Sequence, residues 1–312
     1  MAEEKQKYRL VTRSDFDGLV CAVLLKELDM INDILFVHPK DVQDGKIRIL
    51  SSDITTNLPY VESVYLAFDH HLSEIYRISG KKKNHIIEPD APSTARVVYN
   101  YFGGKETFPE ISGEMLEAVD KADWAQFTMD DILNPKGWEL LNFIMDPRTG
   151  LGRFRNFNIS NYKLMMNLIR YCKTHTIEEI LQLSDVKERA ELYFEHQKKI
   201  KEQLERCSTV HNNLLVVDLR YEEMIYSGNR FLKYAQFPEC NISIQIIWGL
   251  RKQNIVFAVG KSIFNKTSKT NIGELMLKYG GGGHKNAGTC QIGNGKAEKV
   301  LNELIETITS EG

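Results

Sequence analysis

Val64-Tyr65-Leu66-Ala67-Phe68-Asp69-His70-His71 is the stretch that decides the fold class, because an apolar run ends directly in three ionisable residues. A short apolar run of this kind is typical of a strand buried in a sheet. Ligands of open parallel sheets bind beyond the carboxyl ends of the strands. We therefore predict an α/β protein whose ligand site begins at Asp69 and His70.

The rest of the chain indicates further strands and helices. Up to about residue 90, β-type runs alternate with helical patterns, and the predicted strands are residues 8–12, 34–38, 47–50, 64–68 and 85–88. Leu19–Leu28 is predicted to be a crossover helix, and repeated strand–helix units imply a parallel sheet. From about 110 to 205 the pattern is mainly helical, with one long helix or two over Thr176–Cys207. Strands are expected again at 214–217, 242–247 and 255–259.

A chain of 312 residues is long enough for two domains. We predict an N-terminal parallel-sheet domain over residues 1–175 and a helical linker over 176–208. A smaller C-terminal α/β domain is predicted over 209–312, where the β-type texture returns.

Composition and charge narrow the class of protein. Hydrophobic residues make up 42% and charged residues 26%, which is ordinary for a globular enzyme. The net charge of −2 provides no general basic field for long nucleic acids, so a short phosphorylated ligand is favoured. The five cysteines are scattered without a CxxC pair, and no apolar run suits a signal core or membrane span. We expect a cytoplasmic protein without a membrane partner.

Several acidic residues follow predicted strands and could bind a cation. Asp15 and Asp17 are two residues apart on extended backbone, so their side chains point the same way and would repel without a cation. Further candidate ligands are Asp53, Asp69, His70 and either Asp120 or Asp123. This set is too large for one small ion and suits two metals, which act in pairs roughly 3.5–4 Å apart on phosphate esters. The alternative is that each Asp caps a helix or closes a turn.

Gly280–Gly283 form the second motif, followed by His284-Lys285-Asn286-Ala287-Gly288. Consecutive glycines expose backbone N–H groups, and His284 and Lys285 add side-chain donors, so the run favours a phosphate-binding loop. A flexible linker is the alternative. A basic loop containing Arg148, Arg153 and Arg155 could also meet a phosphate, or simply be solvated surface.

Taken in order, Ser14-Asp15-Phe16-Asp17-Gly18, Asp53, Asp69-His70-His71 and the glycine run resemble the DHH phosphoesterase superfamily with its DHHA1 domain. The resemblance spans nearly the whole chain. It implies a Mn²⁺-dependent phosphodiesterase or phosphatase, with Mg²⁺ as a second candidate ion. It also implies a site in the cleft between the DHH and DHHA1 domains.

The resemblance also implies roles for individual residues. Asp15, Asp17, Asp53 and His70 match metal ligands, with Asp53 as the bridge; Asp123, in Asp123-Trp124-Ala125-Gln126-Phe127, is preferred to Asp120 as the last ligand. Asp69, His70 and His71 are the catalytic candidates: Asp69 would lie near a metal or orient His70, and His71 would face the scissile phosphate. The substrate-binding candidates are Arg13, Gly281, Gly282, Gly283, His284, Lys285 and the pair Lys261-Ser262, which stands where the family often has Arg-Ser.

Arg13 departs from the family pattern, because many members have His or Asp two residues before the first motif Asp. Arginine offers only donors and stays protonated, so it is a poor cation ligand. We therefore expect two Mn²⁺ sites of which one is weak, is partly replaced by the guanidinium, or fills only with substrate.

The predicted function is hydrolysis of phosphodiester bonds in short oligonucleotides or in linear or cyclic dinucleotides, by water activated between two metals. One alternative is an exopolyphosphatase or pyrophosphatase acting on phosphoanhydrides. The other is a metal-poor nucleotide-binding protein, suggested by Arg13. Long nucleic acids and membranes are not expected partners, and a homodimer is compatible with the sequence.

Overall fold

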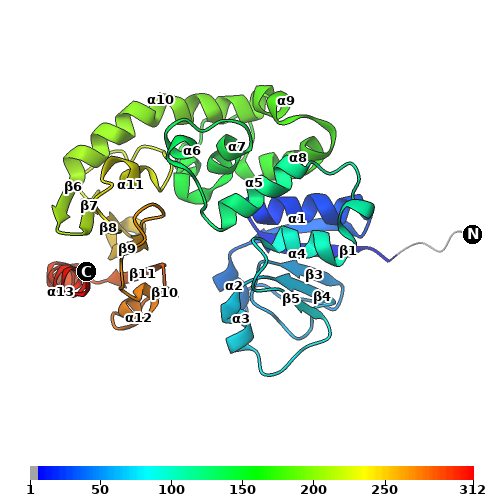
Figure 1. Ribbon diagram of the computed structural model, residues 1–312, viewed down its shortest axis with the longest axis horizontal. Helices are drawn as coiled ribbons and strands as arrows, with labels where there is room; N and C mark the ends of the chain where they lie inside the picture. The colour runs from blue at the N-terminus through cyan, green and yellow to red at the C-terminus, as the bar shows by residue number, and fades with distance from the viewer. Residues whose placement is uncertain (1–5) are drawn as a thin grey trace, which may run out of the picture. The chain divides into compact units, whose positions relative to one another are not determined.

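The structure is a computed structural model that describes residues 6–312 (Figure 1). The chain forms two compact units, one ending at Leu192 and the other beginning at Tyr193. The division falls within the long helix α10 (Ser184–Cys207), which follows α9 (Ile177–Gln182). Thr176–Cys207 therefore contains two helices, one of the two arrangements expected. The domain boundaries at 175 and 209 stay predictions.

The first unit contains a five-stranded sheet in the order β2-β1-β3-β4-β5, and all its strands are parallel. The strands are β1 (Tyr8–Arg13), β2 (Ile31–Val37), β3 (Asp53–Thr56), β4 (Leu66–Asp69) and β5 (His85–Ile87). The prediction of an N-terminal parallel sheet is confirmed. Because β1, β3 and β4 are neighbours, residues that follow these three strands share one edge of the sheet.

The predicted strand at residues 47–50 was wrong. Ile49 instead packs in a hydrophobic cluster with Val42, Leu58 and Val64, and the strand begins only at Asp53. A short apolar run can bury its side chains either from a strand or from an irregular segment, so the pattern alone did not distinguish them. This difference moves Asp53 from the end of a strand to the start of one.

Helices cover the first sheet, and α1 (Phe16–Glu27) is buried on nearly all sides from Phe16 to Leu25. A helix that is apolar all round must be enclosed, and α1 contacts β1 and β2 as well as α4, α5 and α8. Besides α9 and the first part of α10, the other helices of this unit are α2 (Pro39–Gln43), α3 (Leu72–Arg77), α4 (Thr94–Tyr101), α5 (Gly113–Asp123), α6 (Met129–Leu133), α7 (Gly137–Met145) and α8 (Asn161–Thr174).

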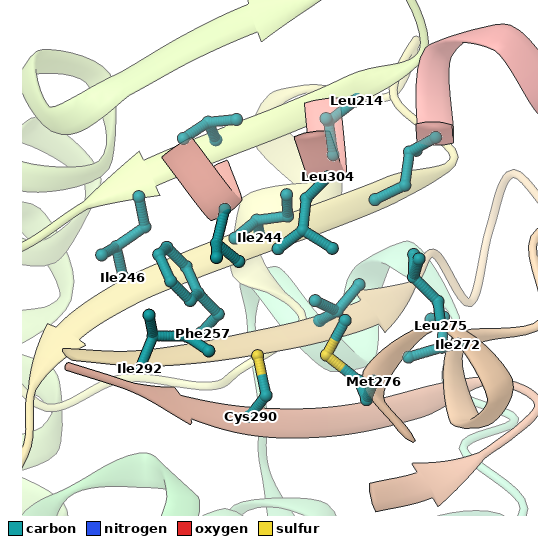
Figure 2. Close-up of a cluster of buried hydrophobic side chains, with 14 of the residues drawn as sticks. Leu214, Ile244, Ile246, Phe257, Ile272, Leu275, Met276, Cys290, Ile292 and Leu304 are labelled. Carbon is teal, nitrogen blue, oxygen red and sulfur yellow. The ribbon is translucent and has the colours of Figure 1, made fainter. Parts of the chain in front are cut away.

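The second unit is a six-stranded mixed sheet in the order β10-β11-β9-β8-β7-β6, in which only β7 and β8 pair in parallel. Figure 2 shows its core, where Ile244, Phe257, Cys290 and Leu304 gather between strands and helix. The predicted second α/β domain is confirmed. Its elements are β6 (Ser208–His211), β7 (Leu214–Asp218), α11 (Leu232–Gln236), β8 (Ile242–Trp248), β9 (Ile255–Lys261), α12 (Ile272–Leu277), β10 (Gly282–His284), β11 (Ala287–Ile292) and α13 (Ala297–Glu311).

Short 3₁₀ turns connect several of these elements: η1 (Gly104–Glu106), η2 (Pro147–Thr149), η3 (Leu151–Arg153), η4 (Leu250–Lys252) and η5 (Asn294–Lys296). All five cysteines are free thiols. Among residues 6–312, no helix has the length and apolar character needed to cross a membrane.

Candidate active site

Asp17, His70 and Asp123 come together although they are far apart in the sequence. Asp17 lies in the first turn of α1 after β1, His70 follows β4, and Asp123 ends α5. Each offers one ligand atom, and these atoms all lie within 4.8 Å of one another. Two carboxylate oxygens and an imidazole nitrogen are a donor set that suits a divalent ion such as Mn²⁺.

The turn between β1 and α1 positions Asp17. Asp15 caps the helix by accepting a hydrogen bond from the backbone N–H of Gly18 at 3.0 Å. A side chain on residue 18 is excluded, because its Cβ would lie 2.1 Å from the carbonyl oxygen of Arg13. Glycine therefore allows α1 to begin directly against the end of β1, which directs Asp17 inward.

The Asp17 carboxylate is buried and faces the start of α4. It accepts hydrogen bonds from the backbone N–H groups of Ala95 at 2.7 Å and Thr94 at 3.2 Å. Burial raises the pKa of Asp17, and the nearby charge of Asp123 raises it further, to about 7, although His70 and Ala95 act in the opposite direction. A cation at this point would stabilise the ionised form of Asp17.

His70 is oriented by its second nitrogen. Nδ1 lies 3.0 Å from the carbonyl oxygen of Ala91, so an N–H there donates and Nε2 is the nitrogen that faces the cluster. Nε2 lies 2.7 Å from Asp123 Oδ2 in an ion pair and makes no well-aligned hydrogen bond. A buried ring nitrogen held this way fits a metal ligand.

His70 and Asp123 each stabilise the charged form of the other. Burial lowers the pKa of His70, but the ion pair with Asp123 outweighs it and raises the value to about 9. Burial would raise the pKa of Asp123, and His70 reverses this, so the Asp123 carboxyl stays below its usual range. Without a metal, the imidazolium provides the positive charge that the two carboxylates attract.

Asp69 orients His71 and the chain that follows β4. One of its oxygens accepts from the His71 ring Nδ1 at 2.7 Å and from the backbone N–H groups of His70 at 2.7 Å and His71 at 3.1 Å. Asp69 is buried, whereas the His71 side chain is 42% exposed. Burial lowers the pKa of His71, and Asp69 more than compensates, so the imidazolium form is favoured.

Asp53 does not join this cluster, and its prediction as the bridging ligand is contradicted. Its carboxylate accepts from Arg9 Nε at 2.9 Å, from Arg9 Nη2 at 2.6 Å and from the N–H of Leu50 at 2.7 Å. In the parallel pairing Asp53 lies opposite Arg9, near the amino end of β1, whereas His70 follows the carboxyl end of β4. Asp53 therefore lies at the opposite edge of the sheet.

The residue after β3 at the correct edge is Asn57, which the sequence analysis missed. Asn57 follows Ile54-Thr55-Thr56 just as His70 follows the end of β4, so a correct strand boundary would have found it. Asn57 Nδ2 donates to Asp17 Oδ2 at 2.9 Å, and Asn57 Oδ1 accepts from Arg13 Nη1 at 3.4 Å.

The other predicted ligands have separate partners. Asp15 Oδ2 lies 3.1 Å from Arg13 Nε, and in the part of the chain that the structure describes the ligand cluster does not include Asp15. Asp120 accepts from Ser93 Oγ at 2.6 Å and Arg96 Nε at 2.9 Å, which ties α5 to α4. Asp123, the preferred choice, is the one that faces His70.

The glycine run is part of a hairpin rather than an open loop. Gly281, Gly282 and Gly283 lead into and form β10, which pairs with β11. A Cβ on Gly281 would lie 2.1 Å from Thr289 O, and one on Gly283, where φ is +156°, would lie 2.3 Å from Ala287 O. Close strand packing therefore requires glycine here, and binding of an anion by this run stays a prediction.

The cationic candidates of the second unit lie near that hairpin. His284 and Lys285 are exposed, and His284 Nδ1 accepts from the N–H of Asn286 at 3.3 Å. Lys261 Nζ donates to Ser268 O at 2.9 Å; burial and the charge of Lys285 both lower its pKa. Ser262 is buried, and its hydroxyl accepts from the backbone of Phe264 and Asn265, so it stabilises a turn.

Three solved structures illustrate what this chain resembles. A pGpG-specific phosphodiesterase, PggH from Vibrio cholerae, is 61% identical, with a TM-score of 0.86 over 98% of this chain and 100% of that one. Two structures of RecJ from Thermus thermophilus, with Mn²⁺ and with Mg²⁺, are 13% and 14% identical with TM-scores of 0.57 and 0.52. They cover 99% of this chain and 53% and 50% of RecJ, and show the fold alone. No protein-family model and no curated protein matches.

Proposed function

The chain belongs to the DHH/DHHA1 phosphoesterase superfamily, and we propose that within it this hydrolase cleaves the phosphodiester bond of linear dinucleotides such as pGpG. The observation that supports this most strongly is the 61% identity, over 98% of this chain and 100% of the other, to a phosphodiesterase specific for pGpG. The small net charge of −2 agrees with a short substrate better than with a long nucleic acid.

We propose that Asp17, His70 and Asp123 hold a divalent ion, with Mn²⁺ as the first candidate. When bound, such an ion lowers the pKa of a coordinated water and polarises a phosphoryl oxygen. The chain's own residues prepare that position. The N–H groups of Thr94 and Ala95 hold the Asp17 carboxylate, and the Ala91 carbonyl keeps the His70 Nε2 lone pair directed toward the cluster.

His71 is the proposed proton donor to the leaving oxygen. Asp69 accepts from its Nδ1, which keeps the ring in one orientation and favours the protonated form. The other nitrogen, Nε2, is then available to donate to a phosphate ester oxygen on the exposed side of the ring. In this proposal Asp69 positions the His71 ring, and His71 contacts the substrate.

We further propose that His284, Lys285 and Lys261 of the second unit bind the substrate away from the reacting bond. His284 and Lys285 are exposed, and Lys261 and Lys285 are near enough for their charges to interact, which makes this surface attractive to a phosphate. The cytoplasmic location and a homodimer also stay predictions.

Hydrolysis assays with purified protein test the proposal. We expect pGpG to be converted to GMP with Mn²⁺, cyclic di-GMP to be untouched, and the His70→Ala variant to be inactive. Hydrolysis of polyphosphate with pGpG intact would instead indicate the exopolyphosphatase alternative. Tight pGpG binding without turnover in Mn²⁺ or Mg²⁺ would indicate a nucleotide-binding protein.

A further inference from the structure

Arg13 and Asn57 form a second group of polar side chains beside the ligand cluster. Arg13 ends β1 and Asn57 follows β3, so both lie at the edge where Asp17 and His70 meet. Arg13 Nε lies 3.1 Å from Asp15 Oδ2, and Arg13 Nη1 donates to Asn57 Oδ1 at 3.4 Å. Asn57 in turn donates to Asp17 Oδ2 at 2.9 Å. The group links Asp15 to Asp17 through two side chains.

This group offers N–H donors at the position where a second cation would need oxygen or nitrogen atoms with free lone pairs. A guanidinium has five N–H donors and no acceptor, and it stays protonated. The Asn57 amide N–H already occupies one lone pair of Asp17 Oδ2, and the backbone N–H of Thr94 donates to the same oxygen. Because Asn57 Oδ1 accepts a hydrogen bond from Arg13, the amide nitrogen of Asn57 is the atom that faces Asp17.

The charges at this edge also disfavour a second cation. The carboxylates of Asp15, Asp17 and Asp123 act on the Arg13 guanidinium. Asp146 also acts on it but is paired with Arg148, so the sum of these charges is minus two when His70 is a neutral ligand. One divalent cation cancels that charge. A second would place two surplus positive charges next to Arg13, which repulsion disfavours.

We propose that this centre binds a single divalent cation, at Asp17, His70 and Asp123, and that the Arg13 guanidinium takes over the role of a second one. Arg13, held by Asp15 and Asn57, binds a non-bridging oxygen of the scissile phosphate and stabilises its developing charge. An arginine suits this role because its fork of N–H groups matches phosphate oxygens. The phosphate contact rests on the proposed function, whereas the metal count does not.

The metal count is measured first, without nucleotide. Protein freed of metal by chelation is titrated with Mn²⁺ by calorimetry, and the bound metal is checked by mass spectrometry after dialysis. We expect one tight site per wild-type chain. The double variant Arg13→His with Asn57→Asp, which supplies a nitrogen and a carboxylate beside Asp15, should bind two. Two tight sites in the wild type, or one in a folded double variant, would overturn the inference.

A matched control uses the other arginine of the same strand. Arg9 lies on β1 at the opposite edge, paired with Asp53, so Arg9→Gln should leave the count at one. If the double variant does not fold, as judged by its melting temperature, Asn57→Asp alone is titrated. It should show a second, weaker site, and its absence would count against the inference.

The phosphate contact is tested with pGpG in excess chelator, where no cation contributes to binding. Arg13→Gln should weaken pGpG binding about tenfold or more and lower kcat/KM in Mn²⁺ by at least about a hundredfold, with the metal count still one. Arg13→Lys should recover part of both losses. Unchanged affinity in Arg13→Gln would overturn the contact. If the wild type neither binds nor cleaves pGpG, the proposed function fails, and the metal count alone decides this inference.

Discussion

Replacing Asp53 with asparagine should destabilise the first unit and leave cation binding intact. The Asp53 side chain is fully buried, and it accepts two hydrogen bonds from Arg9 and one from the Leu50 backbone. Asparagine keeps one acceptor oxygen but removes the charge and turns the other position into a donor that faces the guanidinium. Losing a charge-assisted hydrogen bond costs about 1.5–3 kcal/mol, so we expect a loss of about 2 kcal/mol.

That loss corresponds to a fall in melting temperature of roughly 4–8 °C for a unit of this size. Thermal and urea unfolding measure it, and titration with Mn²⁺ on the same samples should give an unchanged affinity and count. Asp33→Asn is the matched control, because Asp33 is an exposed aspartate on the neighbouring strand β2 and should change the stability little. An unaltered melting temperature combined with lost Mn²⁺ binding would show that Asp53 is a ligand after all.

Three other substitutions probe separate parts of the molecule. His70→Ala should weaken Mn²⁺ binding at least about a hundredfold in calorimetry, because the only nitrogen of the cluster is lost; unchanged affinity would disprove its role. Gly283→Ala should destabilise the second unit by roughly 1–3 kcal/mol in urea unfolding, because its Cβ would meet Ala287 O at 2.3 Å. His284→Ala should raise KM for pGpG with an unchanged metal count, and a reduced count would show that the hairpin was misassigned.

The order of apolar and polar residues was sufficient to predict much of the fold and part of the site. β1 and β4 are apolar runs that end in polar residues, and the Gly18 turn after Asp17 follows from steric limits near the chain itself. These features depend on neighbours in the sequence. The parallel sheet, the placement of Asp17 and His70 at one edge and the second α/β unit could all be predicted for that reason.

Asp53 and Asn57 illustrate what local pattern could not decide. Asp53 is the first residue of the four-residue strand β3 and Asn57 follows its last, and only the pairing of β3 with β1 determines which of them lies at the edge with His70. An error of a few residues in the strand boundary carried the prediction to the wrong edge. The boundary depends on backbone hydrogen bonds to another strand, which the short run at 47–50 did not reveal.

The sequence by itself determined that carboxylates and histidines follow parallel strands, because an apolar run and the polar residues after it are consecutive in the chain. Only the tertiary structure decided which of them meet. Asp120 and Asp123 lie three residues apart on α5, and packing against α4 turns one toward Arg96 and the other toward His70. The glycine run likewise became a hairpin because β11 lies against it. Contacts between distant segments depend on the packing of whole elements, which no short stretch of sequence contains.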